Sequence, residues 1–214
     1  MDGHLVTLRP PTEADFELIS EWMRPGRTAA LAGGGSELAS ADLIRRRAEI
    51  SGESILMVHT KAAVGRPIGF IRWQTRKYAG HYEIGGAVGD AGFWDSGCGA
   101  EATSLVLEHL FHARNAHRVQ FVVGLYNRRT VKMLLNSGIV VEGLLRDYFF
   151  LDGEYHDAVV ASVLRDEFYR LDAWGPIPDA IPREEKEEAV AAFREAMRER
   201  WSGEMFKKLV ERER

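Results

Sequence analysis

One segment near the middle of the chain constrains the fold more than any other part. A strand pattern at 81–89 is followed by a glycine-rich connection, a helical pattern at 98–114 and an apolar strand pattern at 118–126. The helix is indicated by apolar side chains that recur at helical spacing, namely Ala102, Leu105, Val106, Leu110 and Phe111. A crossover of this length joins parallel strands and is nearly always right-handed. The sequence therefore predicts a parallel strand pair with a helix packed against it.

The flanking segments predict further strands and helices. Strand patterns occupy the ranges 5–9, 54–60, 67–75, 143–151 and 154–164. Turn residues separate the second from the third of these strands (Gly65) and the fourth from the fifth (Asp152-Gly153), as expected for hairpins. Helices are expected after the capping residue Thr12, at 40–50, and from the capping residue Asn127 to about Ser137, with a flexible loop at 29–36. We therefore predict an α+β fold in three layers, with helices on both faces of the sheet.

The last forty residues differ in character from the rest. Pro176, Pro178 and Pro182 punctuate a linker, and residues 183–213 read as a charged helix. Its apolar side chains recur every four residues in a single stripe, made of Phe193, Met197, Trp201, Met205 and Leu209. The charge of this helix is balanced, which argues against a membrane-surface role. We expect one domain at 1–172 and a helical extension at 173–214 that packs on its own domain or on a twin subunit in a homodimer.

Composition excludes several classes of function. The formal net charge of −4 provides no basic surface for nucleic acid. The chain has no run of about eighteen uncharged apolar residues, and its first residues lack the features of a signal peptide. A single cysteine, Cys98, excludes internal disulfides and cysteine-based zinc sites, and His109 and His112 lack a third ligand nearby in sequence. We expect a cytoplasmic protein without a metal and with neither nucleic acid nor membrane as a partner.

The connection at 93–102 carries the chemistry of a phosphate cradle. Gly97 and Gly99 allow the backbone to approach a ligand closely, and the first turn of the following helix presents unpaired N–H groups to an anion. The segment lacks the Gly-Lys-Ser/Thr of a P-loop, and it lacks the third glycine and the acidic residue of a dinucleotide fold. A diphosphate is the natural occupant, and the alternative is a tight turn from strand to helix with no ligand.

The same residues resemble motif A of the GNAT acyltransferases, in which this loop holds the pyrophosphate of acetyl-CoA. The stretch Glu83-Ile84-Gly85, followed by Phe93-Trp94 and Gly97-Cys98-Gly99-Ala100-Glu101-Ala102, is similar to the RimJ/RimL branch, although Asp95 stands where that branch commonly has glycine. Further short motifs follow in the family's order at Asn127, Thr130, Ser137-Gly138, Glu142-Gly143, Arg146 and Gly153-Glu154-Tyr155-His156-Asp157. The resemblance covers residues 5–170, and the tail lies outside it.

This resemblance implies a GNAT fold: a mixed, mostly antiparallel sheet whose two central parallel strands splay apart. Acetyl-CoA, or another acyl-CoA, would lie between the strands at 81–89 and 118–126. Its backbone contacts would come from Val88 and from the amides of Ser96, Gly97, Cys98, Gly99, Ala100 and Glu101. Asn127 resembles the family residue that hydrogen-bonds the cofactor or a site water, and its simpler role is that of a helix N-cap.

The resemblance also implies direct attack of a primary amine on the acyl thioester in a ternary complex. The site must accept a proton from an ammonium group, and Glu83 is the preferred base. Many GNAT enzymes place a tyrosine as general acid where this chain has Leu134, so the acid is left open between Thr130 and Tyr148. Cys98 could form an acyl-enzyme, because a helix N-terminus lowers thiol pKa values, but a small filler residue is favoured.

The acceptor pocket is expected from residues 24–40, the 75–82 connection and the final hairpin. These regions contain Trp22, Trp73, Tyr78, Arg146 and Tyr148, each of which could equally lie in the core or on the surface. The acceptor could be a protein N-terminus, an amino acid, a polyamine or an amino-bearing antibiotic. Two alternatives remain open: a non-catalytic acyl-CoA-binding module, and a transferase that uses a larger acyl group in the space beside Gly85-Gly86-Ala87.

Overall fold

The computed structural model describes residues 1–33, 37–61, 65–170, 177 and 179–200, without the side chains of 198–200. The chain divides into two units, Met1–Gly175 and Pro176–Arg214. The first unit contains a mixed seven-stranded sheet in the order β1-β2-β3-β4-β5-β7-β6. The strands are β1 (Val6–Arg9), β2 (Ser54–Thr60), β3 (Pro67–Thr75), β4 (His81–Val88), β5 (Arg118–Gly124), β6 (Val140–Leu151) and β7 (Glu154–Leu164). The predicted fold class is confirmed.

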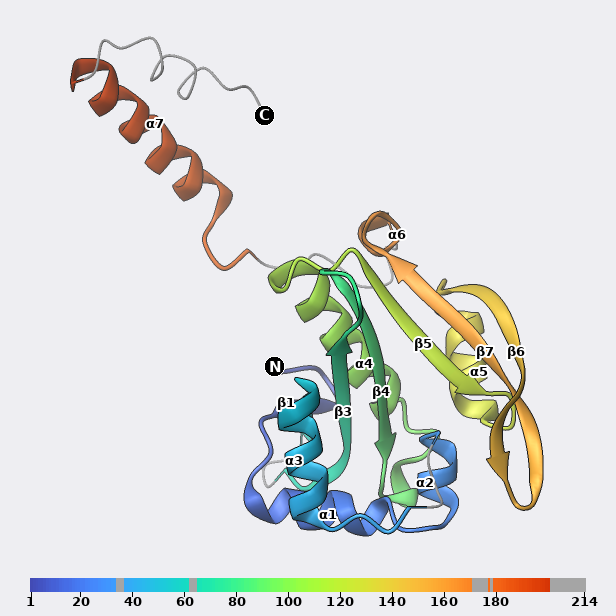
Figure 1. Ribbon diagram of the computed structural model, residues 1–214. Helices are drawn as coiled ribbons and strands as arrows, with labels where there is room; N and C mark the ends of the chain where they lie inside the picture. The colour runs from blue at the N-terminus through green and yellow to red at the C-terminus, as the bar shows by residue number, and fades with distance from the viewer. Residues whose placement is uncertain (34–36, 62–64, 171–176, 178, 201–214) are drawn as a thin grey trace. The chain divides into compact units, whose positions relative to one another are not determined.

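Strands β4 and β5 are the parallel pair, and they stay together for only a short distance. Their register joins His81 to Arg118, Tyr82 to Val119, and Glu83 to Gln120. Beyond these pairs the two strands separate, as Figure 1 shows, while β4 remains paired with β3 as far as Val88 and β5 with β7 as far as Gly124. Backbone groups on the facing edges of the two strands are thereby left without the partners that a continuous sheet would supply. This opening decides where a ligand can enter the sheet.

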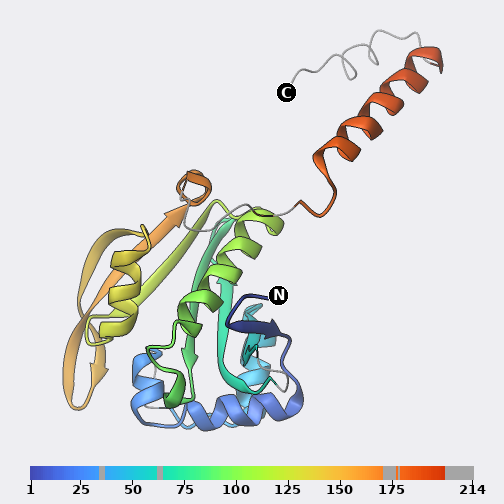
Figure 2. The ribbon, with the colours of Figure 1, turned by 180° about the vertical axis from the view of Figure 1, so that it is seen from behind.

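Helices cover both faces of the sheet. Helices α1 (Glu13–Trp22) and α3 (Ala41–Ser51) pack together on one face, while α4 (Cys98–Glu108) and α5 (Arg128–Asn136) lie on the other (Figure 2). Helix α4 runs directly into a π-helical turn, His109–Ala113. The turn Ala91–Phe93 is a 3-10 helix between β4 and α4. The α4 face is therefore the one at which the predicted glycine turn opens onto the gap between the strands.

The buried core explains why these elements hold together. Ile19 of α1 packs with Met57 and Phe70 of the sheet, and all three are at most 5% exposed. On the opposite face, the rings of Phe111 and Phe168 stack with centroids 4.7 Å apart. Phe168 belongs to α6 (Arg165–Arg170), a short helix that the sequence reading did not include. Burial of such large apolar side chains is the main stabilising contribution.

The structure differs from the predicted elements most clearly at α2 and at the start of β6. Residues 29–36 were expected to be a loop, but the structure has a helix, α2, at Arg27–Leu31. Ala29 and Ala30 are buried and α2 contacts β4, so tertiary packing stabilises a helix too short to form alone. Residues 34–36 lie outside the described residues. Strand β6 begins at Val140 instead of residue 143.

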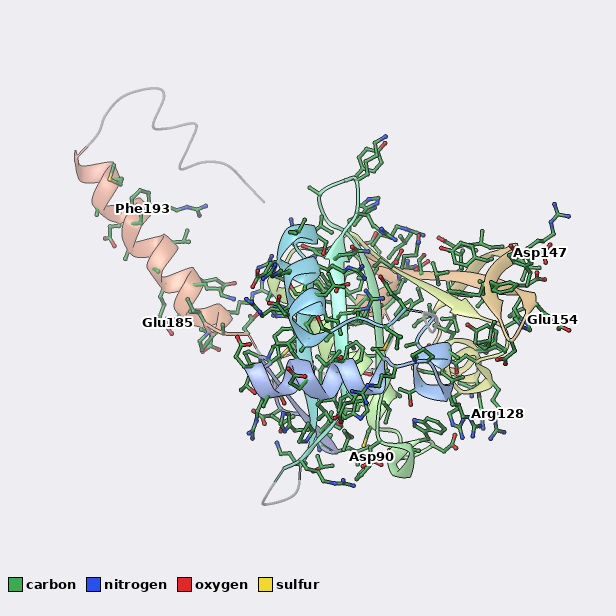
Figure 3. The ribbon with its side chains drawn as sticks, turned by 60° about the horizontal axis from the view of Figure 1, so that its bottom comes forward. Asp90, Arg128, Asp147, Glu154, Glu185 and Phe193 are labelled. Carbon is green, nitrogen blue, oxygen red and sulfur yellow. The ribbon has the colours of Figure 1, made fainter. Side chains whose placement is uncertain are left out.

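The second unit contains α7 (Arg183–Arg200), the first part of the predicted tail helix. Within it, Val190 is 44% and Phe193 57% exposed, and both Phe193 and the charged Glu185, two turns earlier, project from the helix (Figure 3). The remainder of the predicted stripe, Trp201, Met205 and Leu209, lies outside the described residues.

Candidate active site

A cavity of about 540 Å³ occupies the opening between β4 and β5. Residues Ile84–Val88 of β4 and Phe121–Gly124 of β5 form two of its sides. The starts of α4 and α5 and the end of α2 complete its wall. Its volume lies in the range of cavities that bury small-molecule ligands. The separation of the two strands therefore creates a binding site in the middle of the sheet.

The glycine turn at the start of α4 lies on the wall of this cavity. Gly97 has φ of 85°, a left-handed conformation that glycine adopts without strain, and it forms the N-cap of the helix. Gly97, Gly99 and Ala100 all line the cavity. Within the described chain, no hydrogen bond engages the N–H groups of these three residues, whereas Glu101 N donates to Gly97 O at 3.0 Å. Free amides at a helix N-terminus suit an anionic ligand, and a diphosphate fits this chemistry.

Three other residues predicted at the cradle turn their side chains toward the protein. The Ser96 hydroxyl donates to Phe93 O at 2.6 Å and accepts from Cys98 N at 3.3 Å. Cys98 is 5% exposed and does not contribute to the cavity wall in the described structure. Its burial favours the filler role over that of an acyl-carrying nucleophile. The backbone N–H groups of Ser96, Cys98 and Glu101 also donate within the protein, to Phe93 O, Ser96 Oγ and Gly97 O respectively, unlike the free amides of the cradle.

The carboxylate of Glu101 holds the N-terminal segment of the chain against α4. It accepts hydrogen bonds from the amides of His4 at 2.8 Å, Leu5 at 2.7 Å and Val6 at 2.8 Å. Burial alone would raise the pKa of Glu101, but these three bonds outweigh it and hold the pKa below the ordinary value of 4.5. The position of the cradle is thus fixed by a contact between residues far apart in sequence.

Val88 lines the cavity at the end of β4. Its carbonyl oxygen accepts a hydrogen bond from Trp94 Nε1 at 2.7 Å. This bond ties the end of β4 to the connection that leads into α4. The edge of β4 that faces the cavity is formed by residues 84–88, beyond the last residue paired with β5.

The wall formed by α5 is cationic. Arg128, Arg129 and Lys132 all line the cavity, and Arg128 projects outward from the start of the helix (Figure 3). Arg129 forms a bidentate ion pair with Asp95 of the cradle, at 2.8 and 2.7 Å. Sequence reasoning did not identify this set, because these cations form no motif and reach the cradle only through the fold.

Glu83, the predicted base, lies where β4 and β5 begin to separate. It is the last residue of β4 in register with β5, and its side chain is 22% exposed. Arg76 donates to its carboxylate from Nε at 3.0 Å and also from Nη2, and Gln120 donates at 3.4 Å. The residues that line the described cavity do not include Glu83. It therefore borders the site at the closed end of the opening.

A polar network continues from Glu83 across the same face of the sheet. Arg118 donates to Gln120 at 3.0 Å, to Ser162 at 2.7 Å and to Glu142 at 2.5 Å. These hydrogen bonds from Arg118 hold the pKa of Glu142 below its ordinary value, against the effect of burial. The network links β4, β5, β7 and β6 beside the point where the strands diverge.

Asn127 and Thr130 both line the cavity at the start of α5. Asn127 is 7% exposed, and its Oδ1 accepts from Thr130 N at 3.2 Å, which is the N-cap interaction. Its Nδ2 donates to Leu31 O at 2.8 Å, so the same side chain joins α5 to α2. Leu134, which stands where the resemblance led us to expect a tyrosine, is 1% exposed.

Tyr148 lies away from the cavity wall. It is 52% exposed on β6, and its ring contacts Phe149 with centroids 4.9 Å apart. Asp147 and Glu154 belong to the same hairpin (Figure 3). The described lining of the cavity contains Thr130 but not Tyr148.

The aromatic residues expected at the acceptor pocket are dispersed. Trp73 is 8% exposed and packs its ring on His109, so it belongs to the core. Trp22 packs against the α1 core and under Gly89, where a Cβ would lie 2.1 Å from its ring. Tyr78 is 61% exposed. Arg146 is exposed on β6.

The described residues provide neither a metal centre nor a membrane span. Among them, no group of three or more histidine, cysteine, aspartate or glutamate side chains is placed to hold a metal ion. Burial lowers the pKa of His109, and His112 lies beside Tyr169. None of the helices in this part of the chain is long and apolar enough to cross a membrane.

Comparison with known proteins assigns this arrangement to an enzyme class. The family model described as the Acetyltransferase (GNAT) domain matches residues 6–140, so the chain belongs to the GNAT acetyltransferases. Enzymes of this family use acetyl-CoA as co-substrate.

Two relatives carry matching names. An uncharacterized N-acetyltransferase p20 from Bacillus licheniformis is 32% identical over 89 residues, which are 42% of this chain and 49% of that protein. The uncharacterized N-acetyltransferase YoaA from Bacillus subtilis (strain 168) is 32% identical over 72 residues, 34% of this chain and 41% of that protein. The chain thus matches less than half the length of these relatives.

Solved structures confirm the fold. A chimera of spermidine N-acetyltransferase SpeG from Vibrio cholerae and hSSAT has a TM-score of 0.67 at 19% identity, covering 78% of this chain and 99% of that one. An acetyltransferase from T. thermophilus has a TM-score of 0.62 at 26% identity, covering 81% and 93%. Ribosomal-protein-S5-alanine acetyltransferase from Vibrio fischeri has a TM-score of 0.61 at 18% identity, covering 78% and 97%.

Proposed function

We propose that this protein transfers an acetyl group from acetyl-CoA to a primary amine by direct attack in a ternary complex. The observation that carries the proposal is the cavity between the diverging strands, into which the free amides of Gly97, Gly99 and Ala100 open. A diphosphate at these amides would leave the rest of the cofactor to follow the exposed edge of β4, where residues 84–88 lack partners from β5. Val88 and the free amides of Gly97, Gly99 and Ala100 are the proposed cofactor contacts, whereas the amides of Ser96, Cys98 and Glu101 already donate within the protein.

Bound acetyl-CoA supplies the acyl group as a thioester. The proposed role of Glu83 is to accept the proton that the acceptor ammonium must lose, directly or through a water, before its nitrogen can attack. A carbon–nitrogen bond forms as the carbon–sulfur bond breaks, and the electron pair of the broken bond goes to sulfur. Thr130, which lines the cavity, is the proposed donor of a proton to the sulfur, ahead of the exposed Tyr148, and its hydroxyl regains a proton from the acylated nitrogen, which must lose one to become the neutral amide.

Asn127 supports this arrangement as a proposed positioning residue. Its two side-chain hydrogen bonds hold the start of α5 against α2, and both helices border the cavity. Thr130 therefore depends on Asn127 for its place on the wall.

The proposed acyl group is acetyl. Gly85, Gly86 and Ala87 line the cavity, but glycine at position 86 has a structural cause, because a Cβ there would lie 2.4 Å from Phe70 O. Only Gly85 has ordinary space around a Cβ, with Arg72 Nε at 3.6 Å. The glycine run is thus explained in part by the pairing of β4 with β3. Competition between acetyl-CoA and longer acyl-CoAs tests this preference directly.

The proposed acceptor is a primary amine on a small molecule or a peptide N-terminus. The structural neighbours include enzymes named for spermidine and for a ribosomal-protein alanine, and their identities of 17–19% support only the fold. A RimJ/RimL-type protein acceptor, suggested by the motifs at 93–102, is therefore part of the proposal and needs its own test.

The experiment is a thiol-release assay with acetyl-CoA over a panel of amines. The panel contains spermidine, free amino acids, peptides that begin with alanine, and an aminoglycoside. We expect release of CoA above the hydrolytic background with at least one amine, and a rate lower by at least about 10²-fold in Glu83→Gln. Tight binding of acetyl-CoA without release on any amine would contradict the proposed transfer.

A further inference from the structure

Asp95 is an unusual residue at this position. It lies in the loop whose free amides face the cavity, and it lines that cavity itself. A carboxylate beside a proposed diphosphate site repels the ligand and lowers the affinity for it, whereas the free amides of the cradle raise that affinity. Its φ of 65° is also left-handed, a conformation that costs free energy for a residue other than glycine. Two unfavourable features at one residue indicate that its carboxylate has a specific partner.

That partner is Arg129 at the start of α5. The guanidinium group donates from Nε to Asp95 Oδ1 at 2.8 Å and from Nη2 to Oδ2 at 2.7 Å. Bidentate pairing of this kind fixes the orientation of both groups. The hydrogen bonds from Arg129 outweigh the opposing effect of burial and, with a smaller contribution from nearby cations, hold the pKa of Asp95 below its ordinary value, so the carboxylate is charged at neutral pH. The Arg129 side chain is only 25% exposed.

Trp94 provides the second support for the guanidinium group. Arg129 Cζ lies 5.1 Å from the centroid of the Trp94 ring, and Arg27 of α2 lies 4.9 Å from the same ring. Trp94 is itself anchored through its indole N–H to the carbonyl oxygen of Val88. Arg129 is therefore held on the cavity wall by an ion pair and by a cation–π contact.

We propose that Arg129 is a cofactor-positioning residue that faces the diphosphate of CoA, and that Asp95 sets the charge of the cradle by pairing with it. This inference rests on the proposed binding of CoA in the cavity. When both residues are present, the charges of the two side chains cancel, and the ion pair fixes the orientation of Arg129. Without Arg129, the carboxylate of Asp95 would stand alone at an anion site.

The pairing predicts effects of opposite sign for the two single variants. Arg129→Gln leaves the Asp95 carboxylate unpaired, and CoA binding weakens by about tenfold. Asp95→Asn keeps a residue that tolerates positive φ and frees the guanidinium group for the ligand, so binding tightens by about two- to fourfold. The double variant returns to within about threefold of the wild type, because the loss in Arg129→Gln requires the Asp95 charge.

The measurement is calorimetric affinity for CoA, with thermal unfolding of each variant as a check on folding. Arg47 and Glu37 give a matched control, since they form an exposed bidentate pair at 2.7 and 2.6 Å and do not line the described cavity. Arg47→Gln is expected to leave CoA affinity unchanged. The salt dependence of binding should become shallower in Arg129→Gln and steeper in Asp95→Asn. A purely structural ion pair would instead weaken binding in both single variants.

A second ligand, 3′-dephospho-CoA, shows which phosphate of CoA Arg129 acts on, because it keeps the diphosphate and lacks the 3′-phosphate. The effect of Arg129→Gln should persist with 3′-dephospho-CoA, and its disappearance there would overturn the assignment to the diphosphate. If the wild type binds CoA but Asp95→Asn binds it more weakly than the wild type does, this inference is wrong while the proposed function stands. Absence of CoA binding to the wild type would overturn the proposed function as well.

Discussion

Replacement of Glu101 by glutamine should loosen the N-terminal segment from the cradle helix. In the structure its carboxylate accepts three backbone hydrogen bonds, from His4, Leu5 and Val6. A glutamine side chain keeps only one oxygen and turns an NH₂ group toward at least one of the same donors. Hydrogen bonds to a charged group contribute about 1.5–3 kcal/mol each to stability. The net loss is smaller at a partly exposed site, because water can bond to the donors that lose their partner. We expect a net loss of about 2 kcal/mol, or about 4–8 °C in Tm for a chain of this size.

The pH dependence of this loss provides an independent check. The pKa of folded Glu101 lies below 4.5, its value in an unfolded chain. The stabilisation is therefore complete above that pH and is lost as the pH falls through the folded pKa. The gap in Tm between wild type and Glu101→Gln should be largest near neutral pH and should shrink below about pH 4.5.

Differential scanning calorimetry from neutral pH down to about pH 3.5 measures this gap across the relevant titration. Glu17→Gln is a suitable control, because Glu17 is an exposed glutamate of α1 and should give a Tm close to that of the wild type throughout. A Glu101→Gln variant as stable as the wild type at neutral pH, or a gap that stays constant with pH, would refute the reasoning.

Three further predictions concern catalysis and assembly. Glu83→Gln should lower kcat by about 10²- to 10⁴-fold with little change in CoA affinity, the range for loss of a general base, and steady-state kinetics with calorimetry measure both. Cys98→Ala should retain nearly full turnover, and the wild type should form no labelled acyl-enzyme in mass spectrometry, whereas complete loss of activity in the variant with intact CoA binding would contradict the filler role of Cys98. Truncation after Asp172 should convert a dimer to a monomer in light scattering, and an unchanged mass would rule out a role for the tail helix in dimerisation.

The strand–helix–strand unit could be predicted because its signal is local. Apolar residues recur along 98–114 with helical spacing, and the turn before them is marked by glycines. The antiparallel hairpins could be predicted for the same reason. The divergence of β4 from β5 has no such pattern, because it depends on the pairing of each strand with its other neighbour, and it was expected only from the resemblance to a family.

The contacts that organise the site could not be predicted from the residues alone. Arg129 reaches Asp95 across 34 residues, and Glu101 reaches Leu5 across 96, so both partners depend on the topology. Helix α2 was missed since its five residues are too few to show a period, and the burial of Ala29 and Ala30 stabilises it. The sequence located the glycine turn at the start of α4, while the direction of each side chain required the fold.

The backbone amides of Gly97, Gly99 and Ala100 test the central claim most directly. Their ¹H–¹⁵N signals can be followed by NMR while acetyl-CoA is added to the full chain. If these amides bind the diphosphate, their signals should shift progressively and reach saturation at one equivalent of bound ligand, while the amide of an exposed remote residue such as Ile50 stays unchanged. Saturable binding of acetyl-CoA that leaves all three signals in place would contradict the account.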